Sequence, residues 1–367
     1  MTKTNRGNHR SRHISRHTSN HRSKNRSHGR DTRKNNRLYR YKLHGRNWSA
    51  IAIGVGTIKD GNKTYHYNPE LSLTEGGKTH HFRFQKKLGV GADGMVLSYK
   101  NADPKSTFKT VAIKFFQYHS DYLAEKYAYN LLSNNSKMKG YIPRYYGSIE
   151  TEDYRGVVIQ QFKLDLFDRI EHDSRNLNFQ QSVSYLKRLS DIIKEFHSNG
   201  VCINDLKSEN LMIDHRDKIH LIDLCLTGKQ ALKNFSRHCH TVEFDPPDLI
   251  YENRDRICQQ SNDMWSFGIL CYRMFLDKIW PTVDPLKDSQ KYITHPYTSE
   301  EILHDIKECG LKSNQKKWLR KLLIGTSQKV NLQGSSQTIW KGGLLDHNKE
   351  TRLTSGMASN LFHNFTG

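Results

Sequence analysis

Three polar residues that could carry out phosphoryl transfer lie close together in the stretch from Ile203 to Met212. Asp205, Lys207 and Asn210 stand at positions i, i+2 and i+5, directly after a short apolar run. This spacing suits a loop between two strands that projects a carboxylate, an ammonium group and an amide into one cleft. A carboxylate can orient a hydroxyl nucleophile, a cation can stabilise developing negative charge, and an amide oxygen can bind magnesium. The same pattern also occurs in polar surface turns, so the rest of the chain must decide between the two interpretations.

A second stretch could bind phosphates through its backbone. Gly89, Gly91 and Gly94 follow the spacing G-x-G-x-x-G between two strand-like runs, and Val96 comes shortly after them. A dinucleotide-binding turn shares this spacing, but it continues into an amphipathic helix. Because a strand follows here, we predict a glycine-rich hairpin that folds closely over phosphates, with Val96 covering one face of a purine.

A lysine and a glutamate further along the chain could complete the phosphate site. Lys114 ends the apolar run that begins at Val111, and Glu125 lies on a helix predicted over residues 121–132. Taken alone, each could be an exposed surface residue. After a glycine hairpin we predict instead that Lys114 contacts the phosphates, and that Glu125 faces inward and forms an ion pair with Lys114.

In their order and spacing, the glycine hairpin, the Val-Ala-Ile-Lys strand, the helical glutamate and the Asp-Leu-Lys-Ser-Glu-Asn loop resemble the eukaryotic-type serine/threonine protein kinase family. The resemblance covers about residues 82–365. It implies an α+β, bilobal fold with a small β-rich N-lobe that contains one key helix and a larger, mainly helical C-lobe. It also implies ATP and Mg²⁺ as cofactors and protein serine or threonine hydroxyls as substrates.

The resemblance implies roles for single residues. Asp205 would orient the substrate hydroxyl and Lys207 would stabilise the transferring phosphoryl group, while Asn210 and Asp223 would bind magnesium. Gln160 would take the gatekeeper position before the hinge. The residues implied in nucleotide binding are Leu88, Gly89, Val90, Gly91, Ala92, Asp93, Gly94, Met95, Val96, Ala112, Lys114, Glu125, Gln161, Phe162 and Met212.

Later motifs continue the resemblance. The preference for serine and threonine rests on Lys207 and on Thr241, which in such kinases contacts the catalytic aspartate and lysine. Asp263 would hold the backbone of the catalytic loop, and Arg352 would pair with Asp248. We therefore expect a basic tail over residues 1–46, a strand and hairpin extension over 47–81, and a kinase domain over 82–367. The N-lobe is expected over about 82–160 and the C-lobe over about 164–367.

Three positions depart from the family pattern. Ile203 and Asn204 replace histidine and arginine before Asp205, and Cys225 replaces the glycine of Asp-Phe-Gly. Without the arginine, we do not expect phosphorylation of the activation segment to switch the enzyme on. The candidate phosphosites there are Thr227, Ser236 and Thr241.

The groups that would touch ATP, metal and nucleophile are all kept, so the sequence favours an active enzyme. The alternative is a nucleotide-binding pseudokinase scaffold with a polyanion-binding tail. The departures indicate a divergent lineage, such as a viral one.

Positive charge is concentrated at the start of the chain. The 367 residues carry a formal net charge of +21, and residues 1–46 hold fifteen Lys or Arg against a single acid, Asp31. Such a segment cannot bury enough apolar surface to fold, so we expect it to be disordered. Its charge favours contact with nucleic acid or an acidic protein, and a solvated tail without a partner is the alternative.

The cysteines and the hydropathy bear on the cellular setting. The six cysteines show no C-x-x-C pair and no zinc-ligand spacing, and the chain begins without an apolar leader. No stretch approaches the ~18 apolar residues of a membrane span. These features predict a soluble protein in a reducing, intracellular setting, cytoplasmic or nuclear, which for a viral protein is the infected host cell.

Overall fold

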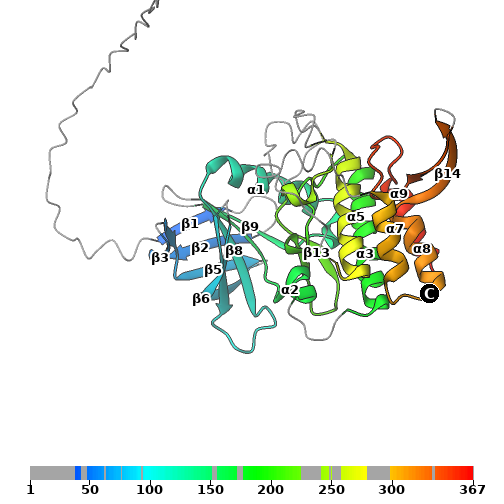
Figure 1. The fold of residues 1–367 in the computed structure, drawn as a ribbon. Helices are drawn as coiled ribbons and strands as arrows, with labels where there is room; N and C mark the ends of the chain where they lie inside the picture. Colours follow the sequence, from blue (N-terminus) through cyan, green and yellow to red (C-terminus); the bar gives the residue numbers. More distant parts are fainter. Residues whose placement is uncertain are drawn as a thin grey trace, which may run out of the picture. The chain divides into compact units, whose positions relative to one another are not determined.

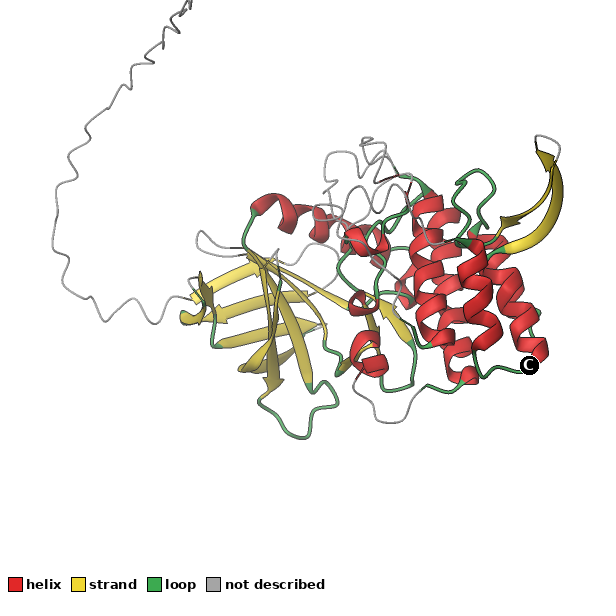
Figure 2. Ribbon diagram, viewed as in Figure 1, coloured by secondary structure: helices red, strands yellow, loops and turns green. Residues whose placement is uncertain are grey.

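The computed structural model describes residues 38–42, 48–61, 63–75, 77–91, 94–150, 155–171, 177–224, 241–247, 249, 258–278, 298–332 and 335–366. Residues 37–367 form one compact unit. Within this unit a β-rich part precedes a mainly helical part (Figures 1 and 2). The expected α+β fold with a β-rich N-lobe and a helical C-lobe is therefore confirmed.

An eight-stranded antiparallel sheet dominates the N-lobe, in the order β1-β2-β5-β6-β7-β8-β10-β9. One helix, α1 (His119–Ser133), packs against β8, β9 and β10. The strands of the sheet are β1 (Leu38–Lys42), β2 (Trp48–Ile53), β5 (Glu70–Glu75), β6 (Lys78–Val90), β7 (Gly94–Asn101), β8 (Thr110–Phe116), β9 (Tyr145–Glu150) and β10 (Arg155–Gln160).

The first strands extend the sheet at the β6 edge. Strands β3 (Gly56–Asp60) and β4 (Lys63–Tyr67) form a separate hairpin, as the turn residues between them predict. Strand β1, however, lies inside residues 1–46, for which we expected disorder, so that boundary is wrong for residues 38–42. The run Leu-Tyr-Arg-Tyr-Lys has aromatic residues that favour strands, and pairing with β2 stabilises it despite its charge. Residues 1–37 lie outside the described residues.

Side chains of the sheet alternate between two hydrophobic clusters, with the two-residue period of a strand. On β8, Val111 and Ile113 belong to the cluster that the N-lobe strands form with one another. Ala112 belongs instead to a larger cluster that runs through α1 into the C-lobe. The next residue on the side of Ala112 is Lys114, so the strand presents its lysine on the face toward the helical lobe.

The C-lobe is built around two long helices, α3 (Phe179–Ser198) and α5 (Gln260–Leu276), and α3 also packs against α9 (Ser355–His363). The side chain of Asn178 caps α3 by accepting a hydrogen bond from the backbone N–H of Gln181. The described part of the C-lobe also contains the helices α2 (Leu166–Glu171), α7 (Ser299–Glu308) and α8 (Ser313–Leu323). None of the helices in the described part of the chain has the length and apolarity needed to cross a membrane.

The C-lobe also contains a small three-stranded sheet and a β-hairpin. Strands β11 (Leu164–Asp165), β12 (Leu211–Ile213) and β13 (Ile219–Leu221) form a three-stranded sheet beside α2. Strands β14 (Gly325–Leu332) and β15 (Ser335–Gly342) form a hairpin that projects from the helices (Figure 1). The loop between α3 and β12 contains Asp205, so the small sheet and the long helix together position that residue.

Candidate active site

The loop between α3 and β12 gathers the three polar residues of the Ile203–Met212 stretch. Asp205 is buried, and Lys207 Nζ lies 3.0 Å from Asp205 Oδ2. The side-chain amide of Asn210 donates to the Asp205 backbone oxygen at 2.9 Å and to Asp205 Oδ2 at 3.1 Å. Thr241 comes from a separate segment, donates to Asp205 Oδ1 at 2.8 Å and accepts from Lys207 Nζ at 2.7 Å. The loop is therefore a connected polar cluster and not a solvated turn.

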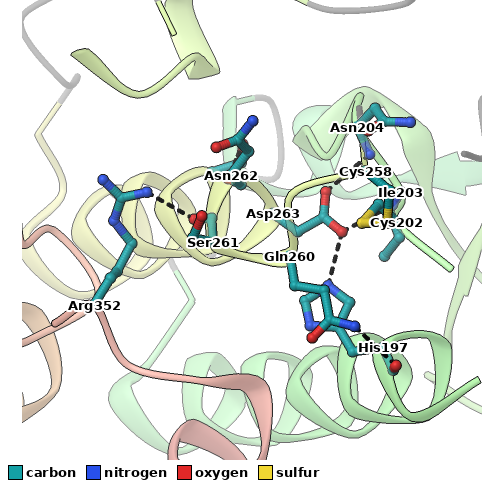
Figure 3. A network of polar contacts seen from close by, with 11 residues as sticks. His197, Cys202, Ile203, Asn204, Cys258, Gln260, Ser261, Asn262, Asp263 and Arg352 are labelled. Carbon is teal, nitrogen blue, oxygen red and sulfur yellow. Dashed lines mark hydrogen bonds and ion pairs between the residues drawn. A yellow bond between two sulfur atoms is a disulfide. The ribbon is translucent and has the colours of Figure 1, made fainter. Parts of the chain in front are cut away.

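A buried carboxylate on α5 holds the backbone of this loop (Figure 3). Asp263, which is 1% exposed, accepts hydrogen bonds from the backbone N–H groups of Ile203 and Asn204, each at 2.8 Å. Its Oδ2 atom is also 2.8 Å from His197 Nε2, at the end of α3. Asp263 thus connects α3, the loop and α5 just before Asp205, as the resemblance implied for the loop backbone.

The two residues before Asp205 suit their positions in this joint. Ile203 is 2% exposed and belongs to the large hydrophobic cluster. Asn204 has φ of 64°, in the left-handed region that Asn tolerates better than most side chains. The replacement of the family's histidine and arginine is therefore compatible with the local backbone and with the packing.

On the other side of the cleft, a lysine lies between two carboxylates. Lys114 Nζ on β8 is 2.7 Å from Glu125 Oε2 on α1 and 2.7 Å from Asp223 Oδ1. Glu125 is 1% exposed, so the predicted inward-facing ion pair is present. Asp223 has φ of 52°, a left-handed backbone conformation that interrupts the extended chain after β13. These contacts bring β8, α1 and the segment after β13 together.

A buried tyrosine lies next to this ion-pair cluster. Tyr129 is fully buried on α1, one turn after Glu125, and its ring stacks on that of Tyr145 with a centroid distance of 5.2 Å. Burial, followed by the charges of Glu125 and Asp223, raises the pKa of the Tyr129 phenol well above its usual value. The phenol therefore stays neutral at physiological pH and adds no charge to the cluster.

The glycine hairpin between β6 and β7 has the space that the sequence predicts. A Cβ atom on Gly89 or Gly91 would meet no atom within 4 Å, so the backbone there is open on its surface. A Cβ atom on Gly94 would lie 1.8 Å from the backbone oxygen of Phe115, so this glycine is required for the close approach of β7 to β8. Leu88 and Val90 are exposed on the hairpin, and Ala92 and Asp93 lie outside the described residues.

Not every side chain predicted to line the nucleotide cleft faces it. Val96 and Ala112 pack with the cluster that continues into the C-lobe, on the cleft side of the sheet. Met95, by contrast, is 0% exposed and belongs to the N-lobe cluster on the opposite face. The Met95 side chain therefore points to the face opposite Val96, because neighbouring residues of a strand point to opposite faces.

The gatekeeper prediction was wrong for a related reason. Antiparallel partners carry their side chains on the same face, and Ile159 pairs with Ala112 while Gln160 pairs with Val111. Ile159, which is 7% exposed, therefore lies on the face of Ala112 and Lys114. Gln160 points the other way.

The remaining predicted contacts lie after β10 and on β12. The side chain of Gln161 accepts a hydrogen bond from Ser98 on β7 at 2.8 Å. Phe162 is 9% exposed, and its ring centroid lies 5.2 Å from that of His220. Met212 is partly buried opposite His220 on the small sheet. These contacts connect the segment after β10 to β7 and to the small sheet of the C-lobe.

The donor set at the cleft fits magnesium. Asp223 provides carboxylate oxygens, and Asn210 uses its amide nitrogen on Asp205, which leaves its oxygen as the atom available to a metal. Mg²⁺ prefers oxygen ligands and is usually held by only one or two protein side chains together with phosphates and water. Asn210 and Asp223 could therefore hold the ion between them.

A cavity of about 310 Å³ lies next to the catalytic loop, between α2 and α5. Its apolar lining includes Phe167, Phe244 and Leu270. Glu209 and Glu243 also line it, and both side chains are exposed. Glu171 and Arg273, which form an ion pair, line it as well, so the cavity combines an apolar lining with a net negative charge beside the catalytic loop.

A disulfide joins Cys202 to Cys258, with 5.4 Å between the Cα atoms. The sequence reasoning did not anticipate it, because the two cysteines are 56 residues apart and follow no spacing motif. Persistent disulfides are typical of oxidising environments, and in reducing ones they are usually transient and redox-sensing. In the reducing setting that the sequence predicts, this bond would therefore be transient and redox-sensing.

The roles of His197 and Ile159 were also missed. The sequence does carry a signal for His197: it is a polar residue at the end of an apolar helix face, eight residues before Asp205. Several other predictions lie outside the described residues: those on Cys225, Thr227, Ser236 and Asp248.

Comparison with known proteins agrees with this geometry. A family model described as "Protein kinase domain" matches residues 82–363. Serine/threonine-protein kinase PKH2 of Candida albicans is 26% identical over 278 residues, which is 69% of this chain and 26% of that protein. Aurora kinase A-A of Xenopus laevis is 27% identical over 156 residues, 41% of this chain and 37% of that protein.

A third relative extends the match along most of the chain. The probable serine/threonine-protein kinase KIN1 homolog of Enterocytozoon bieneusi is 22% identical over 298 residues, 78% of this chain and 46% of that protein. The chain thus spans less than half the length of each of these three relatives. They give no support to the viral lineage suggested by the departures.

Proposed function

We propose that this chain, which belongs to the protein kinase domain family, is an ATP-dependent serine/threonine protein kinase. One observation carries the proposal. Lys114, held between Glu125 and Asp223, and Asp205, bonded to Lys207 and Thr241, are arranged as one phosphate-binding group and one nucleophile-orienting group. Pseudokinase scaffolds need neither arrangement, so the geometry favours the active enzyme over that alternative.

In the proposed reaction, a hydroxyl oxygen of the substrate forms a bond to the γ-phosphorus of ATP while the bond from that phosphorus to the bridging oxygen breaks. The carboxylate of Asp205 orients the hydroxyl and accepts its proton. The ammonium group of Lys207 stabilises the charge that develops on the transferring group. ADP leaves with the bridging oxygen, so atoms and charge are conserved.

The remaining side chains bind and orient. Lys114 contacts the phosphates and is kept in place by Glu125, and the backbone of Gly89 and Gly91 has room to lie over them. Asn210 and Asp223 would hold magnesium, which supplies charge neutralisation on the phosphates when bound. Preorganised charges of this kind need no rearrangement during the reaction.

Thr241 supports the preference for serine and threonine. Its hydroxyl lies between Asp205 and Lys207, at 2.8 and 2.7 Å. It therefore ties the segment that begins at Thr241 to the nucleophile-orienting group. The cavity beside the loop supports a peptide substrate that has a basic residue near an apolar one, because Glu209 and Glu243 accompany its apolar floor.

The test uses purified full-length chain, radiolabelled ATP and three peptide libraries that carry serine, threonine or tyrosine as the acceptor. We expect magnesium-dependent labelling of the serine and threonine libraries, which EDTA abolishes, and stronger labelling when arginine flanks the acceptor. Labelling confined to the tyrosine library would contradict the serine/threonine assignment. Nucleotide binding without labelling of any library would favour the pseudokinase scaffold.

A second, separate proposal concerns the tail: residues 1–37 bind nucleic acid or an acidic protein. Its support is the concentration of positive charge there: residues 1–37 hold twelve Lys or Arg and one acid, Asp31. Deleting residues 1–37 should then remove salt-dependent retention of the chain on immobilised nucleic acid. Retention that is unchanged by the deletion would refute this proposal and leave the kinase proposal intact.

A further inference from the structure

The Cys202–Cys258 disulfide lies at the joint that holds the catalytic loop (Figure 3). Cys202 directly precedes Ile203 and Asn204, whose N–H groups donate to Asp263. Cys258 lies five residues before Asp263 and just before α5 begins at Gln260. The disulfide and the Asp263 carboxylate therefore connect the same two segments, one covalently and one through hydrogen bonds.

The loop closed by the disulfide contains part of the proposed active site. The chain between the two cysteines carries the residues assigned to chemistry and metal binding, and Thr241 as well. Asp263 is insensitive to redox conditions, whereas the disulfide can be opened by a thiol. The hydrogen bonds to Asp263 therefore form in either redox state, whereas reduction breaks the disulfide.

The two sulfur-bearing residues differ in accessibility. Cys202 is 0% exposed, whereas Cys258 is partly exposed. Cys258 is thus the more accessible of the two residues, so its sulfur is the expected point of attack for a thiolate, with the Cys202 sulfur as the leaving group. Among the described cysteines, Cys271 is buried and Cys309 donates its thiol to the Ile306 backbone oxygen, so neither belongs to this joint.

We propose that Cys202–Cys258 is a redox modification site for a dithiol reductant, and that its opening slows phosphoryl transfer by loosening the catalytic loop. One thiolate of the reductant attacks Cys258 Sγ, the S–S bond breaks, and Cys202 leaves as a thiolate that takes up a proton. The second thiol then attacks the mixed disulfide and releases Cys258, which is also protonated. The protein gains two electrons and two protons, and the dithiol is oxidised to a disulfide.

The loss should be partial because Asp263 still holds the loop. A displacement of the reacting groups by a fraction of an ångström to 1 Å can cost up to about a hundredfold in rate, so about tenfold is expected here. The effect on rate rests on the proposed kinase function. The effect on the loop itself does not.

The first experiment compares the full-length chain before and after dithiothreitol treatment, with the disulfide state determined by alkylation and mass spectrometry. We expect kcat to fall about tenfold on reduction, KM for ATP to change less than twofold, and kcat to recover on reoxidation. The double variant Cys202→Ala/Cys258→Ser should match the reduced protein and no longer respond. The variant Cys309→Ser should respond like the wild type.

Wild-type protein that keeps its kcat with the disulfide open would overturn the proposal, as would a double variant that still responds. Hydrogen exchange at the Ile203 and Asn204 amides gives a readout that needs no activity. We expect their exchange to accelerate on reduction, and unchanged exchange would overturn the proposal. If exchange accelerates while neither redox form transfers phosphate, the kinase function fails and the redox joint stands.

Discussion

The residues around Asp205 show how a catalytic loop can change its sequence and keep its geometry. Ile203 fills a buried position by apolar contact, and Asn204 adopts a left-handed conformation at φ of 64° while its N–H donates to Asp263. Neither role needs the imidazole or the guanidinium found in the family. Control by an activation-segment phosphate through that guanidinium is therefore not expected in this chain.

The backbone of Asn204 gives a prediction on stability. Replacing Asn204 with valine should lower the free energy of unfolding by about 1–2 kcal/mol, because a β-branched side chain is strained at positive φ. The matched variant Asn204→Gly, which has no Cβ, should be destabilised less than Asn204→Val. Urea denaturation measures both. Equal destabilisation by valine and glycine would show that the side chain, and not the backbone conformation, matters.

At the scale of elements, the sequence predicted the parts whose signals are local. The helix that carries Glu125, the glycine hairpin and the β3–β4 hairpin are present because periodicity, glycine spacing and turn residues act over a few positions. The fold class was implied by the resemblance that the glycine hairpin, the lysine strand, the helical glutamate and the Asp205 loop show, in that order, to the protein kinase family.

Features that depend on distant pairing were not predictable in the same way. Val157, Val158 and Ile159 are all buried, so both faces of β10 are apolar and hydropathy could not show which residue shares the face of Ala112. The register between β10 and β8 shows that this residue is Ile159. The side-chain direction of Met95 follows from the same alternation. The Cys202–Cys258 bond depends on how α5 approaches the loop, which no local pattern reports.

The turn between β12 and β13 belongs to the small sheet that follows the catalytic loop, and it gives a pH-dependent prediction. Asp214 accepts hydrogen bonds from the N–H groups of Arg216 and Lys218, at 2.8 and 2.9 Å, and its Oδ2 lies 3.0 Å from His220 Nε2. Partial burial by itself raises the pKa of Asp214, but the hydrogen bonds, with that from His220 largest, outweigh it, and the pKa is lowered.

A lowered pKa means that the charged form of Asp214 stabilises the fold above the unfolded pKa of about 3.9. This contribution is lost as the pH falls through the lower, folded pKa. Asp214→Asn should therefore lower Tm by about 2 °C at pH 7. The difference from the wild type should shrink as the pH approaches 3. Thermal denaturation followed by circular dichroism across this range provides the check, and a difference that grows toward acid would show the opposite sign.

At the scale of the whole molecule, the sheet of the N-lobe extends beyond the residues that the family model matches. The matched residues begin at Phe82, within β6, whereas β1, β2 and β5 continue the sheet beyond that strand. Leu71 and Leu73 of β5 are at most 1% exposed and pack in the same cluster as Phe82 and Tyr99. Strand β5 therefore contributes side chains to the N-lobe core.

This arrangement predicts different outcomes for two truncations. Deleting residues 1–37 should leave Tm unchanged within about 1 °C, because the truncation ends before β1. Deleting residues 1–77 should destabilise the chain strongly, since burial of Leu71 and Leu73 contributes about 2 kcal/mol each and the β6 edge becomes exposed. Thermal denaturation and gel filtration of the two variants test this. A fully stable, monomeric 78–367 chain would show that the extra strands are dispensable.

The most direct test of the kinase proposal is the rate of γ-phosphate transfer by Asp205→Asn, measured beside its affinity for ATP. Asparagine keeps the size of the side chain but cannot accept the hydroxyl proton, so transfer to a serine peptide should fall at least about a hundredfold. Kd for ATP should stay within about twofold, since the phosphate-binding group around Lys114 is untouched. Phosphate transfer at the wild-type rate by the Asp205→Asn variant would contradict the account.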